Sequence, residues 1–228
     1  MIVFLDWRKG KTKEETRQFH GVRVFELIFG EKMTELGLNI DSFQLISIYC
    51  LADERKKYSY KKEESIGNVS IMTPYDCRNF MALESNEEKY EEFERLIYLY
   101  AVPVLKDLSP LPEEKILEIV QDSLEEIVRQ NYEIVFLVGK TPKKSPSRKK
   151  IAILRGIHRA EGFQLYCEVF NTRGYRLANQ LLVEEVGNEF AYARFLGELK
   201  WEDDSTIIVK SRTSSWQVII EIEEGKRK

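Results

Sequence analysis

Histidine and cysteine are scarce in this chain, which has 2 histidines and 3 cysteines among 228 residues. With only His20 and His158, a catalytic triad or a histidine metal site has little to draw on. The cysteines are odd in number, widely spaced and free of any Cys-x-x-Cys pair, so the sequence predicts neither a disulfide framework nor a zinc site. We expect buried free thiols, no metal and no cofactor.

Long hydrophobic runs are also missing, and no stretch approaches the ~20 apolar residues that cross a bilayer. The apolar segment 1–5 is too short for the hydrophobic region of a signal peptide, and its basic residues follow it instead of preceding it. These features predict a cytosolic protein without a membrane partner. The composition, 43% hydrophobic and 32% charged, is typical of a folded globular protein.

Nucleotide-binding motifs are absent as well. Gly139-Lys140-Thr141 follows a predicted strand, as in a phosphate-binding loop, but Ile134 stands where the first glycine of that motif belongs. Pro142 removes a backbone donor from the point where a helix N-terminus would bind phosphate. No Gly-x-Gly-x-x-Gly motif occurs either.

The periodicity predicts an α+β fold, with a mixed α/β domain over residues 1–131 and an antiparallel β-rich domain over 132–228. Thr12 with Glu15 and Ser85 with Glu88 have capping-box spacing, and each predicts a helix start. Pro103 is expected to kink or stop the second of these helices, and Pro112 to occupy the first position of the next. Around Val22 the pattern favours helix but leaves a strand open. The strands expected are 1–5, 43–51, 65–73, 133–139, 151–157, 163–170, 175–186, 198–201, 206–210 and 216–222.

Charge differs between the two parts. Residues 1–131 have 18 Lys and Arg against 25 Asp and Glu, a net charge of -7, whereas residues 132–228 have 17 against 13, a net charge of +4. The basic cluster in the second part has no interleaved aromatic residues, so it favours a mobile solvated loop, with phosphate or nucleic-acid contact as the weaker alternative. Its members are Lys143, Lys144, Arg148, Lys149 and Lys150.

Acidic residues crowd the start of the helix that follows Ser85. The helix macrodipole favours negative charge there, so a solvated face explains them, and a negative patch for a basic partner is the sharper hypothesis. Adjacent pairs elsewhere, Asp203-Asp204 and Glu184-Glu185, would point to opposite sides of a regular strand and do not suggest an acid/base pair.

Residues 40–89 combine a strand, a lysine-rich stretch, a second strand and a helix opening of the form Asp-x-x-x-Phe-x-x-Leu followed by Ser-x-Glu-Glu-Lys. This layout resembles small cytoplasmic immunity proteins of bacterial polymorphic-toxin systems. The likeness extends over residues 1–131 and implies neutralisation of a toxin by tight binding, without catalysis. The matching residues are Asp76, Phe80, Leu83, Ser85, Glu87, Glu88 and Lys89, in a segment that begins at Ile40-Asp41-Ser42-Phe43.

We therefore expect a non-catalytic binding protein, with an immunity protein as its most specific form. Charge would speed encounter with the partner and aromatic side chains would anchor the interface. The candidate contacts are Glu87, Glu88, Glu91, Glu92, Tyr58, Tyr60 and Trp216.

The alternative is a small-molecule-binding or enzymatic β-barrel-like C-terminal domain. Its pocket would be lined by aromatic residues and would hold a few polar groups. The lining candidates are Tyr166, Tyr192, Trp201 and Trp216, and the polar candidates are His158, Arg155 and Glu168.

Overall fold

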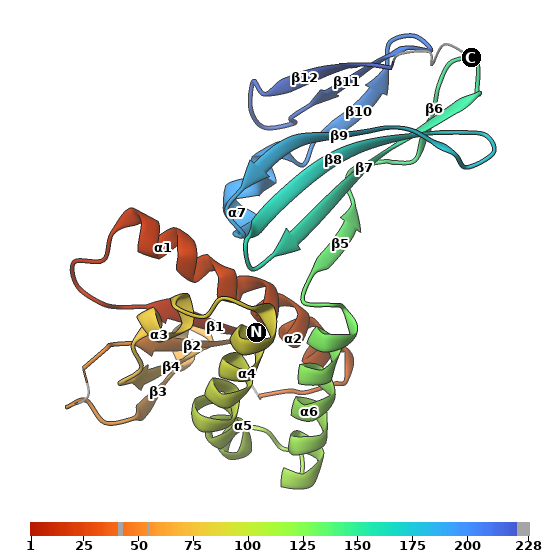
Figure 1. Ribbon diagram of the computed structural model, residues 1–228. Helices are drawn as coiled ribbons and strands as arrows, with labels where there is room; N and C mark the ends of the chain where they lie inside the picture. Colours follow the sequence, from red (N-terminus) through yellow and green to blue (C-terminus); the bar gives the residue numbers. More distant parts are fainter. Residues whose placement is uncertain (41–42, 54, 223–228) are drawn as a thin grey trace. The chain divides into compact units, whose positions relative to one another are not determined.

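The computed structural model describes residues 1–40, 43–53 and 55–222 (Figure 1). The predicted α+β class is confirmed: a mixed sheet with helices is followed by antiparallel sheets. The chain divides into two compact units, Met1–Glu133 and Ile134–Lys228. Asp41 and Ser42, which belong to the segment that resembles immunity proteins, lie outside the described residues.

The N-terminal unit contains a four-stranded sheet in the order β1-β2-β4-β3. The strands β1 (Ile2–Asp6), β2 (Leu45–Cys50) and β4 (Asn68–Thr73) are parallel, and β3 (Ser59–Glu63) is antiparallel to β4. The three parallel strands were predicted. The edge strand β3 was not, because its largely exposed sequence, Ser-Tyr-Lys-Lys-Glu, carries no apolar alternation that would mark a strand.

Only one face of this sheet is fully covered. Side chains that alternate along the parallel strands, such as Phe4, Ile48 and Ile71, are buried on the core face. There Phe93 packs against Phe4, and the Phe25 ring stacks on Phe93 at 5.7 Å between ring centroids. On the opposite face, which we call the outer face, the apolar side chains are half-buried and the polar side chains of Ser47, Asn68 and Ser70 are buried.

Two helices of this unit begin where the capping boxes predict. Thr12 and Ser85 both form complete capping boxes, at α1 (Lys13–Phe19) and α4 (Asn86–Leu96). Around Val22 the chain is helical: a 3-10 turn, His20–Val22, leads into α2 (Arg23–Glu35), and Gly37 follows that helix with a positive φ of 80°. The short helix α3 (Cys77–Met81), capped by Asp76, was not predicted.

Pro103 does not end the helical segment. A π-helical turn, Ile97–Ala101, joins α4 to α5 (Val102–Leu108), so the proline lies near the start of a new α-helical stretch, where its missing N–H is tolerated. In the last helix, α6 (Glu113–Arg129), the helical spacing of the apolar residues predicts one buried stripe that includes Val128. The structure buries Ile116, Ile119, Val120, Leu124 and Ile127, but Val128 is 46% exposed near the end of the helix. Pro112 precedes this helix as its cap residue and is not its first helical residue.

The C-terminal unit is antiparallel throughout its described strands. One sheet contains β5 (Ile134–Leu137), β7 (Lys150–Arg159), β8 (Gly162–Asn171) and β9 (Arg176–Glu185), with β6 (Lys143–Lys144) also paired to β7. The second contains β10 (Glu198–Trp201), β11 (Thr206–Lys210) and β12 (Gln217–Glu221). The segment between β9 and β10 forms α7 (Glu189–Tyr192) and a 3-10 turn, Ala193–Phe195.

The core of the C-terminal unit is filled by side chains from both sheets. Leu154, Leu165 and Val209 are fully buried, and the rings of Phe163 and Tyr192 stack at 3.9 Å between centroids. Over the described residues, no helix has the length and apolar character needed to span a membrane.

Candidate functional site

The four carboxylates of the predicted acidic patch on α4 differ in their hydrogen bonds and in their exposure. The Glu88 carboxylate accepts the backbone N–H groups of Ser85 and Glu84 as part of the helix cap, and these hydrogen bonds lower its pKa. Glu92 accepts two hydrogen bonds from Arg95, at 2.7 and 2.8 Å. Glu87, Glu88 and Glu91 are exposed and Glu92 is half-buried, so three of the four predicted carboxylates face solvent.

The predicted aromatic anchors are partly used for packing. Tyr58 stacks on Tyr100 at 5.9 Å between centroids, and the Tyr60 hydroxyl donates to Asp107 at 2.7 Å. Tyr58 and Tyr60 are still more than a third exposed. Trp216, in contrast, packs beside the core of the C-terminal unit and meets the Phe195 ring edge-on at 5.4 Å.

The basic segment 141–150, for which the composition predicted a loop, forms a hairpin with a short strand. Its β6 strand pairs with β7, and the Lys143 carbonyl accepts the indole N–H of Trp201 at 3.0 Å. The Lys150 ammonium donates to the carbonyl of Asp204, whose carboxylate accepts the Ser147 N–H.

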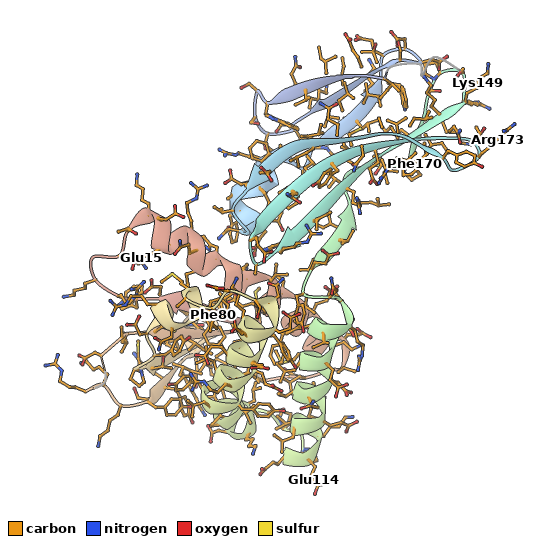
Figure 2. The ribbon with its side chains drawn as sticks, in the orientation of Figure 1. Glu15, Phe80, Glu114, Lys149, Phe170 and Arg173 are labelled. Carbon is orange, nitrogen blue, oxygen red and sulfur yellow. The ribbon has the colours of Figure 1, made fainter. Side chains whose placement is uncertain are left out.

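The exposed basic residues of this hairpin are Lys144, Arg148 and Lys149. Lys150 pairs with Asn171, so the turn before β7 lies beside the turn after β8, which carries Arg173 (Figure 2). Arg173, from the turn after β8, therefore adds a further basic residue to the cluster around Lys149.

The residues predicted to line a C-terminal pocket fall on opposite sides of one sheet, and Tyr192, Trp201 and Trp216 belong to or pack against the core. His158 lies on the core side of β7 against Tyr192, whose hydroxyl is 3.3 Å from its Nδ1 atom. Arg155, Tyr166 and Glu168 lie on the other side of the same sheet, where Arg155 donates to Glu168 at 2.8 Å. Alternation along the strands separates the two groups, because residues an odd number apart face opposite ways.

The outer face of the N-terminal sheet presents a surface that contains none of the predicted site residues. Val3, Leu5, Tyr49 and Met72 are half-buried there. Trp7 follows β1, is 62% exposed and contacts Tyr49 edge-on at 5.2 Å between centroids. The available signal was a tryptophan directly after the first strand, next to charged residues.

On the same face, β2 and β4 also carry three buried polar side chains, Ser47, Asn68 and Ser70. The Ser47 hydroxyl donates to the side-chain oxygen of Asn68 at 3.0 Å, and the Asn68 amide donates to Ser70 at 3.0 Å. Their lateral hydrogen bonds satisfy them within the sheet.

The carboxyl ends of the parallel strands carry a network of ion pairs. Asp6, the last residue of β1, accepts two hydrogen bonds from the Arg8 guanidinium at 2.8 and 2.9 Å, and Glu15 accepts a third at 3.1 Å. These contacts raise the pKa of Arg8, the hydrogen bond to Asp6 most of all. Arg78 on α3 binds Asp76, and this hydrogen bond lowers the pKa of that carboxyl.

A polar hollow of ≈ 320 Å³ opens at this edge of the sheet, lined by Arg8, Lys9, Lys11, Glu15 and Arg78. Figure 2 labels Glu15 where α1 begins. A second hollow of ≈ 270 Å³ lies beside it, shares Ala52 with it and is lined by Pro74, Tyr75, Asp76, Asn79 and Tyr100. Carboxyl ends of parallel strands are where open α/β sheets commonly bind ligands.

The cysteines are buried free thiols, as expected. Burial raises the pKa of Cys167 to about 12, and the pKa of Cys77 is raised by its hydrogen bond with Cys50 and by burial. Thiols of this kind are poor nucleophiles at neutral pH. Within the residues that the structure describes, no group of three or more His, Cys, Asp or Glu side chains is placed to hold a metal ion.

Comparison of the chain with protein-family models, curated proteins and solved structures finds no match. The resemblance to immunity proteins therefore rests on the residues of segment 40–89. Several of these stabilise the fold directly: Asp76 caps α3, Phe80 is buried in the core, and Ser85 and Glu88 cap α4.

Proposed function

We propose that the protein binds another protein, without catalysis, through the outer face of its N-terminal sheet. The observation that carries the proposal is Trp7, a large aromatic side chain that is 62% exposed above a half-buried apolar face. Exposed apolar patches with aromatic residues are typical of protein interfaces, and tryptophan is enriched among the residues that dominate binding energy.

The most specific form of the proposal is an immunity protein that occludes the active site of a toxin. The resemblance of segment 40–89 supports this form, and the charge of the first part of the chain favours a basic partner. Residues 1–131 have a net charge of -7, and Glu87 and Glu91 remain exposed to attract positive charge. A nuclease toxin domain, which is basic because it binds nucleic acid, fits this description.

Affinity capture with a tryptophan variant tests the binding surface. Tagged wild-type protein and W7A are used to capture proteins from the native cell extract, with F190A as the matched control because Phe190 is an exposed aromatic residue of the other unit. We expect a stoichiometric partner with wild-type protein and F190A, and an affinity reduced roughly 30-fold with W7A, equivalent to the ~2 kcal/mol of a strong interface residue.

Co-expression then tests the immunity role. The captured partner is produced in a host cell alone, with the wild-type protein and with W7A. Growth arrest by the partner that wild-type protein relieves and W7A does not relieve is the expected result. A partner that binds W7A and wild-type protein equally would refute the proposed surface, and a partner without toxicity would refute the immunity role.

A further inference from the structure

The polar hollow at the carboxyl edge of the N-terminal sheet gathers positive charge from two segments. Arg8, Lys9 and Lys11 come from the connection between β1 and α1, and Arg78 comes from α3. The nearby carboxylates are Asp6, Glu15 and Asp76, so the four cations exceed the anions by one. The hollow is therefore suited to an anionic ligand.

These carboxylates orient Arg8 and Arg78, and each guanidinium still has N–H groups that can donate to a ligand. Arg8 is nearly buried and is oriented by Asp6 and Glu15 through its Nε, Nη1 and Nη2 atoms. A guanidinium has five N–H donors, so each arginine retains some for a ligand. Arginine held in a fixed orientation binds phosphate oxygens well, because little side-chain entropy is then lost on binding.

The adjoining hollow offers a different chemistry. Its tyrosines, Tyr75 and Tyr100, supply aromatic surface, and Asn79 supplies an amide that can both donate and accept. Ala52 lines both hollows, and Asp76, which lines this one, holds the Arg78 of the other. A ligand with a phosphate at one end and a ring at the other matches this arrangement.

We propose that the paired hollows at the carboxyl ends of β1, β2 and β4 bind a nucleoside monophosphate. The phosphate lies among Arg8, Lys9, Lys11 and Arg78, and the nucleoside lies against Tyr75 and Tyr100. This inference does not rest on the proposed protein partner.

Calorimetric titration of the full chain tests the site. The probes are AMP, GMP, CMP and UMP, with inorganic phosphate and adenosine as partial ligands. The test variant is K9A/R78A, which removes an exposed lysine and an ion-paired arginine while leaving Asp76 to cap α3. The matched control is K200A/R212A in the C-terminal unit, which likewise removes an exposed lysine and an ion-paired arginine.

We expect saturable binding of at least one monophosphate, weaker binding of inorganic phosphate and no binding of adenosine. K9A/R78A should weaken monophosphate binding roughly tenfold or more, the equivalent of a charge-assisted hydrogen bond, and K200A/R212A should not change it. Added salt should weaken binding, because the lysines are exposed.

Three results would overturn the inference. The first is the absence of saturable binding for all four monophosphates at low salt. The second is equal affinity for a monophosphate and inorganic phosphate, which would remove the nucleoside from the adjoining hollow. The third is an equal effect of K9A/R78A and K200A/R212A, which would place binding elsewhere.

Discussion

The buried carboxylate of Glu26 should be a large contributor to the stability of the N-terminal unit. Its Oε1 atom accepts the backbone N–H of Phe4 at 2.6 Å, and its Oε2 atom accepts from Arg23 at 2.7 Å. Because β1 is at the edge of the sheet, the N–H of Phe4 that points away from β2 depends on this side chain. Glu26 is 2% exposed.

Replacing Glu26 by alanine removes both contacts at once. The Phe4 N–H then loses its acceptor in a buried environment, which costs about 1–3 kcal/mol, and a broken buried ion pair costs about 3–5 kcal/mol. Since these costs overlap and Arg23 can turn towards water, we expect E26A to lower the free energy of unfolding by about 3 kcal/mol. E26Q should lose less, because its amide oxygen can still accept from Phe4.

The matched control is E35A, on the same helix. Glu35 also forms an ion pair three residues away, with Lys32 at 3.0 Å, but its side chain is 65% exposed. Exposed pairs contribute about 0–1 kcal/mol, so E35A should change stability little.

Urea unfolding followed by far-UV circular dichroism measures both variants. The longer helices α2, α4 and α6 all belong to the N-terminal unit, so the helical signal reports that unit. If E26A were no less stable than E35A, Glu26 would not be the acceptor on which the outer edge of β1 depends.

Two further predictions concern the other unit and the effect of pH. G156A should destabilise the C-terminal unit by about 1–3 kcal/mol in thermal unfolding, because a methyl group there would lie 2.7 Å from the Phe136 ring; an unchanged melting temperature would contradict this. The cap hydrogen bonds lower the pKa of Glu88 below its ordinary 4.5, so its stabilising effect is complete above that pH and is lost as the pH falls through the lowered value. In urea unfolding E88Q should therefore be less stable than wild type at neutral pH and equal to it in strong acid, and a difference that did not vary with pH would count against the cap.

Local sequence signals predicted many of the elements because their causes are local. Thr12 and Ser85 cap helices with their own hydroxyls, and the stripe on α6 repeats at the helical period. The alternating strands of the second unit were predicted for the same reason. The same capping box predicts that Glu88 takes part in the cap of α4, which its hydrogen bonds with Glu84 and Ser85 confirm.

Other features depend on neighbours that are distant in sequence. The strands β3 and β6 have exposed, charged sequences and form because a partner strand provides hydrogen bonds. The basic segment around Ser147 is held by Asp204, which is 57 residues away in the sequence. No local pattern carries such information.

The amino-acid sequence by itself determined the α+β class, the helix caps, the main strands and the burial of the thiols, since these follow from periodicity, capping chemistry and hydrophobicity. Only the tertiary structure decided that Trp7 stands on a half-buried sheet face and that Arg8 and Arg78 meet at one hollow. The physical reason is that a parallel sheet brings together the carboxyl ends of strands that are separated by whole helices, and side-chain chemistry there depends on which strands become neighbours.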